Sequence, residues 1–520
     1  MKKNSSTIRD NLGSLMMPRL EVGRFETDSD YRNYISSLIE RRYVGGFCIF
    51  GGTVESLPII LDELQSQARR HDLPPLIMSC DCEWGLPMRL NAGGTEFPHL
   101  MALAQMGDRN GIRRVAAAIG TEMSALGLHW NFAPVADINS NPNNPIINIR
   151  AFSGNPQTVA DCAKYFFEGL ADSGIAATAK HFPGHGDTAV DSHRALPSID
   201  RSLEEFEKIE LYPFNLLIKA GIPAIMTGHI AAPKLAESLG APIEEIDLPA
   251  TISPTLTQKL LHERLHFNGI IVTDSLEMHG LQTILTDPAE IAIRAFISGA
   301  DILLMPTDPV AAHSGLLAAF DSGRISEISI RQSLARIELF REKYVVEKTQ
   351  VMTVQWLDHQ VIADSAAANA LSLVGLIPKP LTPSSVIILA SGSESERKQL
   401  GSVNEFTTNE LPAIRTFIYS VGEITGADYW GTEPLIISIH RPRGALTDEK
   451  NTGSVMSRAL SLLQIFLTRS IHPIGVVALG DPYIADSFAE VAPGFVMKTF
   501  SDSMPSVKAA LTLLKENIIQ

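Results

Sequence analysis

Residues 1–345 alternate between short apolar runs rich in β-branched residues and longer amphipathic stretches, and this alternation restricts the possible folds. The short runs predict buried strands, and the stretches between them have the apolar spacing of helices. Eight repeats of strand and helix predict a closed (β/α)8 TIM-like barrel. The candidate strands are residues 13–18, 46–50, 75–80, 128–135, 176–182, 224–230, 269–276 and 301–306. The clearest helical stretches are residues 54–70, 158–173, 202–220, 253–266 and 289–298.

A second α/β pattern follows a stretch near residues 343–353 that has neither strong periodicity nor core character. Its candidate strands are residues 371–376, 385–390, 416–419, 434–439, 475–479 and 495–499, and its candidate helices are 454–469 and 506–516. This pattern predicts a smaller α/β sandwich domain. We therefore expect a catalytic barrel over residues 1–345, a linker over 346–361 and the sandwich over 362–520.

The net charge narrows the class of partner, and the cysteines indicate the compartment. The chain has 43 Lys and Arg against 58 Asp and Glu, a formal charge of −15 that disfavours nucleic acid and anionic membranes. We expect a small, neutral or locally recognised ligand, no cofactor and no metal, while the sequence leaves the oligomeric state open. The N-terminus lacks an apolar signal segment, and the four cysteines suit buried reduced thiols, so we expect a cytoplasmic protein.

Ionisable residues gather where the predicted barrel strands end. Active sites of such barrels lie at the carboxyl ends of the strands. A single Asp or His at a strand end is commonly a helix cap or a satisfied structural group. A charged ring at one barrel mouth is costly to desolvate without a ligand, so the coincidence of five strand ends favours a functional site. The residues are Asp81, Arg150, Lys180, His181, His229 and Asp274.

The stretch after the fifth strand is the richest in chemistry. Residues 179–197 read AKHFPGHGDTAVDSHRALP, far longer than an ordinary connection between strand and helix. Asp191 lies two residues before His193, a spacing that lets the carboxylate accept one ring N–H and leave the other nitrogen for proton transfer. We expect His193 to be the general acid and base, with Asp191 orienting it.

Asp274 follows the β-branched run 270–273, so its carboxylate should project from a rigid strand. A carboxylate held in this way can attack an electrophilic carbon. The residues alone leave a second interpretation equally open, in which Asp274 only caps the segment that starts at Ser275.

These residues carry a resemblance to a known family. KHFPGHGDTAVDSH at residues 180–193 resembles the signature of the NagZ-type β-N-acetylglucosaminidases of glycoside hydrolase family 3. ADINSNPNNPIINIRAF, IMTGHI and IIVTDSLEM agree with it in the same order. The sandwich domain is similar to the family less specifically, through ALGDPYIADSF at 478–488.

The resemblance implies a role for each matching position. It implies Asp274 as catalytic nucleophile, His193 as acid and base, and Asp191 as its partner. It implies further that four residues bind the terminal sugar, namely Asp81, Arg150, Lys180 and His181, and we assign His185 to shaping the loop. Two positions depart from the family pattern: Trp84 replaces a glycine near the mouth, and Asn155 replaces an acid after Arg150.

The resemblance therefore implies a retaining exo-acting β-N-acetylglucosaminidase that forms a covalent glycosyl-aspartate, acting on muropeptides of cell-wall recycling. A phosphorylase specific for N-acetylglucosamine would use the same residues, because a neutral imidazole does not repel phosphate. A metal-dependent barrel hydrolase is a further alternative, although an H-x-H motif after the first strand is absent. A retired sugar-binding barrel is disfavoured because Asp191, His193 and Asp274 are all present.

Overall fold

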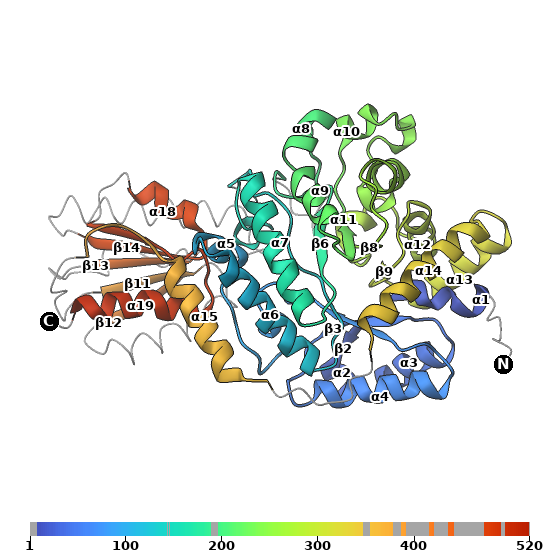
Figure 1. Ribbon diagram of the computed structural model, residues 1–520, viewed down its shortest axis with the longest axis horizontal. Helices are drawn as coiled ribbons and strands as arrows, with labels where there is room; N and C mark the ends of the chain where they lie inside the picture. The colour runs from blue at the N-terminus through green and yellow to red at the C-terminus, as the bar shows by residue number, and fades with distance from the viewer. Residues whose placement is uncertain are drawn as a thin grey trace. The chain divides into compact units, whose positions relative to one another are not determined.

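The computed structural model divides into two compact units, which we describe separately (Figure 1). It describes residues 8–142, 144, 146–188, 196–346, 354–377, 386–391, 415–420, 435–440, 473–489 and 494–518. The first unit spans residues 1–95, 112–147 and 151–359, and the second spans 96–111, 148–150 and 360–520. Two short segments from the first half of the chain therefore pack with its C-terminal part.

The first unit contains a closed ring of parallel strands. Its first strand is split by Pro18, which has no backbone N–H for the ladder, into β1 (Met16–Met17) and β2 (Arg19–Glu21). The ring continues through β3 (Gly46–Phe50), β4 (Ile77–Cys80), β5 (Trp130–Asn131), β6 (Thr178–Phe182), β7 (Ala224–Thr227), β8 (Ile270–Thr273) and β9 (Leu303–Leu304). Bridges from Trp130 to Ala176 and from Val272 to Ile302 join the three ladders, and β9 pairs with β1. The barrel predicted from the sequence is confirmed.

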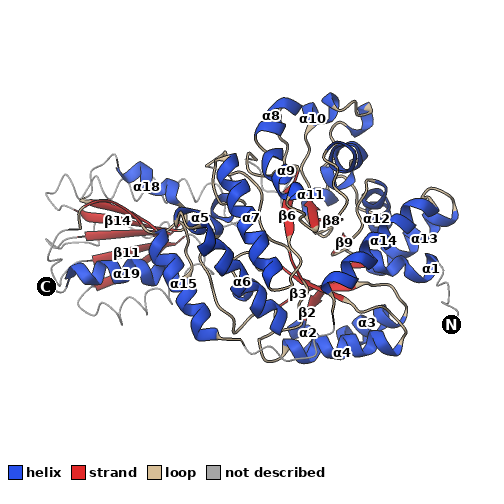
Figure 2. Cartoon of the chain, viewed as in Figure 1, coloured by secondary structure: helices blue, strands red, loops and turns tan. Residues whose placement is uncertain are grey.

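Helices surround this ring, as Figure 2 shows. The main ones are α3 (Ser29–Glu40), α4 (Leu57–Arg70), α6 (Arg109–Ala125), α7 (Pro156–Asp172), the π-helical segment Thr255–Arg264, α12 (Pro288–Ile297), α13 (Pro309–Asp321) and α14 (Glu327–Tyr344). Every residue of β4, β6, β7 and β8 is buried. Burial on both faces explains why β4, β7 and β8 read as largely apolar runs, whereas β6 carries Lys180 and His181.

Several predicted elements differ in detail from the structure. The strands predicted at residues 128–135 and 301–306 are shorter, namely β5 (Trp130–Asn131) and β9 (Leu303–Leu304). The first strand begins at Met16 instead of residue 13, because Leu12–Leu15 forms a buried 3-10 turn whose apolar residues read like strand. The predicted helix 202–220 is two helices, α8 (Leu203–Lys208) and α9 (Leu211–Lys219). The ring of Pro213 would clash with the carbonyl of residue 209 in a continuous helix, so the helix ends there.

The second unit is built on a sheet in the order β10-β15-β14-β13-β11-β12, parallel except for β10 against β15. The strands are β10 (Ser372–Gly375), β11 (Val386–Ser391), β12 (Arg415–Ser420), β13 (Leu435–His440), β14 (Pro473–Leu479) and β15 (Phe495–Lys498). Its described longer helices are α15 (Trp356–Ala370), α18 (Pro482–Ala489) and α19 (Met504–Ile518). All six predicted strands are present. The predicted helix 454–469 lies outside the described residues.

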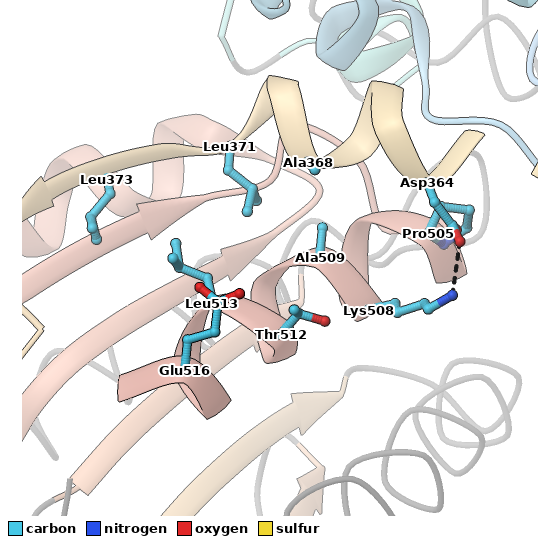
Figure 3. Close-up of a pocket in the computed structure, with 10 residues that line it drawn as sticks. All are labelled: Asp364, Ala368, Leu371, Leu373, Pro505, Lys508, Ala509, Thr512, Leu513 and Glu516. Atoms are coloured by element: carbon cyan, nitrogen blue, oxygen red, sulfur yellow. Dashed lines mark hydrogen bonds and ion pairs between the residues drawn. The ribbon is translucent and has the colours of Figure 1, made fainter. Parts of the chain in front are cut away.

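A groove of about 480 Å³ runs between α15, β10 and α19 in this unit (Figure 3). Lys508 on α19 donates to Asp364 on α15 at 2.8 Å, which joins the two helices. Leu371, Leu373 and Leu513 make the lining largely apolar.

The segments that join the second unit from the first half of the chain are held by polar contacts. Asn148 begins the turn η3 (Asn148–Arg150) and donates its amide to Asp481 at 3.1 Å. His99 precedes α5 (Leu100–Gln105), and its Nδ1 lies 2.8 Å from the Ser501 hydroxyl. Arg150 is thus part of the second unit.

The remaining global features concern the cysteines and membrane spans. Cys48, Cys80, Cys82 and Cys162 are buried free thiols, as predicted. In the part of the chain that the structure describes, no helix combines the length and hydropathy that a membrane span needs.

Candidate active site

Polar side chains lie at the carboxyl ends of β4 to β8, all at one end of the barrel. Parallel strands bring these ends to the same rim, which is where barrel enzymes place their active sites. The residues are Asp81 and Glu83 after β4, Asp137 after β5, Lys180 and His181 within β6, His229 after β7 and Asp274 after β8.

A buried ionic cluster surrounds Asp81. Lys180 Nζ donates to Asp81 Oδ1 at 2.8 Å and lies 2.7 Å from Glu83 Oε1. Arg89 donates to Asp81 Oδ2 at 2.6 Å from one guanidinium nitrogen and at 3.2 Å from Nε. Burial raises the pKa of Asp81, but the adjacent charges of Lys180 and Arg89 outweigh it and hold the pKa well below its usual range. Asp81 is therefore a carboxylate at any working pH.

The backbone between the two acids is fixed by Asn131 in β5. Its amide donates to the Cys82 carbonyl at 3.1 Å, and its carbonyl oxygen accepts the Cys82 N–H at 3.0 Å. This two-point contact holds the short segment that carries Asp81 and Glu83, so both carboxylates reach Lys180.

Asp137 organises the two histidines of the next strand end. Its Oδ1 accepts the backbone N–H groups of His181 at 3.1 Å and His185 at 2.7 Å. Its Oδ2 lies 2.7 Å from His181 Nδ1. Burial raises the pKa of Asp137, yet the facing charge of His181 and these hydrogen bonds keep it below its usual value. A carboxylate only accepts, so His181 Nδ1 carries the proton and its Nε2 is left for other contacts.

The start of the loop after β6 packs tightly against the loop after β5. Asn144 donates its amide to the His185 carbonyl at 2.8 Å, and His185 Nδ1 lies 2.7 Å from the Thr188 hydroxyl. Burial lowers the pKa of His185 to about 4, so its ring is neutral at pH 7. A Cβ on Gly186 would meet the Ile138 carbonyl oxygen at 1.6 Å, so only glycine fits there. These contacts support the loop-shaping role assigned to His185.

Asp274 sits directly beyond β8 and is held by its neighbours on both sides. Its N–H donates to the Thr227 carbonyl at 2.9 Å, and its Oδ1 accepts the Ser275 N–H at 2.7 Å. Burial raises the pKa of Asp274, but positive charge on His181 and His229 outweighs burial, and the pKa lies below its ordinary value. The next helix, α11 (His279–Gln282), begins five residues later and has Met278 at its N-cap position.

An irregularity in β6 places two successive side chains in the site. Consecutive strand residues point to opposite faces, so Lys180 and His181 would ordinarily diverge. The pairing of β6 with β7 shifts register between Ala179 and Phe182, and such irregularities redirect side chains. Both residues accordingly interact electrostatically with Asp274.

Of the residues predicted from the sequence, Asp81, Lys180, His181 and Asp274 lie together in the first unit. Arg150 belongs to the second unit. Asp191 and His193 lie outside the described residues. Sequence reasoning missed Arg89, Asp137 and the contact of Glu83 with Lys180. The position of Asp137 just past a predicted strand was an available signal.

Glu210, the N-cap residue of α9, lies beside the described part of the loop after β6. It pairs with Arg201, which also contacts Asp187 at 2.8 Å. Gly184 has a φ of +137°, and a Cβ there would approach Glu210 Cγ to 2.7 Å. Burial raises the pKa of Glu210 to about 7, against the opposing charge of Arg201.

This raised pKa predicts a pH-dependent effect of Glu210→Gln on stability. The unfolded carboxyl has a pKa near 4.5, whereas the folded one keeps its proton to about pH 7. Folding therefore takes up a proton in this window, and the wild type loses stability as pH rises through 7. The uncharged amide removes this loss, so the variant should gain about 1–3 kcal/mol on the wild type between pH 5 and pH 8. Urea unfolding at both pH values measures it, with exposed Glu237→Gln as control, and a pH-independent difference would contradict it.

Metal-ligand geometry is a separate question. Within the described ranges, the His, Cys, Asp and Glu side chains form no group of three arranged to hold a metal ion.

Comparison with known proteins decides the family. Residues 7–339 match the family of the glycosyl hydrolase family 3 N-terminal domain. The chain belongs to glycosyl hydrolase family 3. Family 3 membership agrees with the barrel and with the resemblance seen in the sequence.

The sequence of this chain is similar to those of two named family 3 proteins. Beta-hexosaminidase A of Pseudoalteromonas piscicida is 35% identical over 329 residues, which cover 59% of this chain and 55% of that protein. A beta-N-acetylglucosaminidase/beta-glucosidase of Cellulomonas fimi is 30% identical over 367 residues, 68% of this chain and 63% of that protein. The chain thus spans little more than half the length of these two relatives.

Among solved structures, a family 3 beta-N-acetylglucosaminidase from Paenibacillus sp. str. FPU-7 is similar over nearly the whole chain. The TM-score is 0.83 at 27% sequence identity, and the match covers 99% of this chain and 97% of that one. This likeness agrees with a barrel followed by an α/β sandwich.

Proposed function

We propose that this protein is a retaining, exo-acting β-N-acetylglucosaminidase that removes terminal β-linked N-acetylglucosamine. The observation that carries the proposal is Asp274, a carboxylate kept ionised at the carboxyl end of β8 by the charges facing it. An ionised, rigidly held carboxylate in a barrel mouth suits attack on an anomeric carbon. Names of the relatives support the choice of sugar.

In the proposed mechanism, an Asp274 oxygen bonds to the anomeric carbon as the glycosidic C–O bond breaks. His193 donates its proton to the leaving oxygen, oriented by Asp191, and a covalent glycosyl-aspartate results. His193 then takes a proton from water, which attacks the anomeric carbon and releases Asp274. An imidazole suits both steps because its ordinary pKa of about 6.5 is close to neutral pH.

We assign sugar binding to Asp81, Arg150, Lys180 and His181. The Asp81 carboxylate is an acceptor for sugar hydroxyls, and Lys180 and the Nε2 of His181 offer polar contacts beside it. Arg89, Glu83 and Asp137 hold Asp81, Lys180 and His181, respectively, before a ligand arrives. Such preorganisation reduces the entropy lost on binding.

We further propose that the natural substrates are muropeptides in which N-acetylglucosamine is linked to anhydro-N-acetylmuramic acid, and that the enzyme works in the cytoplasm during cell-wall recycling. Chitin fragments would occupy the same sugar subsite. Trp84 is half-buried after β4. Of its two roles, stacking on a second sugar or packing beneath the loop, we favour packing.

Product analysis tests this proposal. Purified protein is incubated with aryl β-N-acetylglucosaminide, aryl β-glucoside, chitobiose and a cell-wall digest, each with and without inorganic phosphate. We expect kcat/KM for the N-acetylglucosaminide to exceed that for the glucoside by about 10²-fold, because a site built for the amide leaves its partners unpaired with glucose.

The products distinguish the mechanisms. NMR should show that the β-anomer of N-acetylglucosamine is released first, as retention of configuration requires. Sugar 1-phosphate as main product would establish the phosphorylase instead, and an inverted product would contradict the mechanism. Loss of activity on chelation, restored by zinc, would establish the metal-dependent alternative.

A further inference from the structure

His229 is an ionisable group of the barrel mouth to which the proposed reaction assigns no step. It follows β7 at the carboxyl end of the barrel and is 1% exposed. Its Nε2 lies 2.8 Å from the Ser275 carbonyl oxygen, and its Nδ1 lies 2.7 Å from the Thr251 hydroxyl. The ring thus connects the turn Ala250–Ile252 with the residue that follows Asp274.

The partners decide where one of the ring protons is. A carbonyl oxygen only accepts, so Nε2 of His229 carries a proton directed at Ser275. The Thr251 hydroxyl lies 2.7 Å from Nδ1 and 3.1 Å from the Gly228 carbonyl oxygen, so it holds the other side of the ring.

The hydrogen bonds of His229 lead through Ser275 to the proposed nucleophile, Asp274. Ser275 accepts from His229 through its carbonyl and donates its N–H to Asp274 Oδ1 at 2.7 Å. The backbone N–H of Asp274 donates to Thr227, two residues before His229. The carboxylate and the imidazole are therefore fixed to one another through Ser275 and through the end of β7.

Ionisable groups face Asp274 from several elements. His181 and Lys180 face it from β6, and His229 faces it from the end of β7. His185, which is neutral at pH 7, faces it from the loop after β6. Lys180 is already paired with Asp81 and Glu83, and His181 with Asp137.

We propose that His229 is a positioning residue that orients the Asp274 carboxylate through Ser275. The inference rests on the proposed function of Asp274. The hydrogen bond of His229 to Ser275 fixes the peptide that holds one carboxylate oxygen.

Two substitutions separate the contacts of His229. His229→Gln places an amide nitrogen near the position of Nε2, so it keeps the donor to Ser275 but loses the charge. His229→Asn places its amide nitrogen near Nδ1, so it keeps the Thr251 contact and loses Ser275. Thr251→Val and Thr251→Ser form a second pair that removes or keeps the hydroxyl. His313→Gln is the matched control, because His313 in α13 is also buried but packs against Tyr43, away from the site residues.

We expect His229→Asn to lower kcat by about 10²-fold with KM within about threefold, and His229→Gln to recover most of that loss. Both should move the acidic limb of kcat/KM to higher pH, because Asp274 loses a facing positive charge. Thr251→Val should lower kcat by about tenfold, and Thr251→Ser should lower it less. His313→Gln should keep wild-type kcat and pH profile.

The readouts distinguish this inference from the function on which it rests. Equal activities for His229→Asn, His229→Gln and wild type, with an unmoved acidic limb, would overturn it. So would losses that follow only the melting temperature and are equal in all the histidine variants. If His229→Asn does not fold, the two Thr251 variants and His229→Gln decide the question by the same pH profiles. Wild-type turnover by Asp274→Asn would instead overturn the proposed function.

Discussion

Asp274→Asn is expected to lower kcat for an aryl β-N-acetylglucosaminide by about 10⁴-fold or more. The amide is a poor nucleophile, so the covalent bond to the anomeric carbon no longer forms. Its oxygen still accepts the Ser275 N–H that Oδ1 accepts in the wild type, so the local backbone is retained. The variant should therefore fold and bind the sugar, with a KM or inhibitor Kd within about tenfold of the wild type.

Three measurements check this expectation. Steady-state kinetics give the loss, thermal unfolding reports the fold, and mass spectrometry with a slowly hydrolysed fluorinated N-acetylglucosaminyl fluoride locates the covalent adduct in the wild type. Asp287→Asn is the control, because Asp287 caps α12 at the surface and its amide should also accept the Ala289 N–H. An adduct on a residue other than Asp274 would contradict the assignment even if the variant were inactive.

Much of the barrel could be predicted because its strands are buried on both faces. The run Ile270–Thr273 is apolar and β-branched and is buried throughout, so periodicity, length and composition agree. The end of such a strand also places Asp274, since parallel strands share one rim. The break between α8 and α9 could have been predicted as well, because Pro213 follows residue 209 by four positions.

The partners within the site could not be predicted in the same way. Arg89 lies in a turn eight residues after Asp81 and has no periodic context, yet it donates twice to that carboxylate and stacks on Phe50 with its guanidinium carbon 4.8 Å from the ring centroid. Asp137 collects three hydrogen bonds from residues 44 to 48 positions away. Such contacts depend on register and on the irregularity in β6, which local sequence does not specify.

The site therefore consists of charges that are paired before a ligand arrives. Lys180 touches both Asp81 and Glu83, and Asp137 touches both His181 and His185. Removing one member of such a set leaves the other buried and unpaired, so single substitutions at these positions affect stability as well as binding. Conservative amide replacements are for this reason more informative than alanine.

His193→Ala is expected to have an effect that depends on the leaving group. With an alkyl or sugar aglycone, the departing oxygen needs a proton, and kcat/KM should fall by about 10²–10⁴-fold. With an activated nitrophenyl aglycone, the departing phenolate is stable without a proton, so the rate of glycosidic bond cleavage should fall much less. The variant should then accumulate the glycosyl-enzyme, because the base for the water step is also missing, and a burst of nitrophenol should precede slow turnover.

The pH profile and a double variant complete the test of His193. Loss of the acid should remove the basic limb of kcat/KM that its imidazole causes, while the acidic limb of Asp274 remains. Asp191→Asn should lose less than His193→Ala, and the double variant should resemble His193→Ala because residues that act as one unit are not additive. His266→Gln, at an exposed position, serves as control. Equal losses for nitrophenyl and sugar aglycones, or additive losses in the double variant, would show that proton transfer belongs to another residue of the mouth.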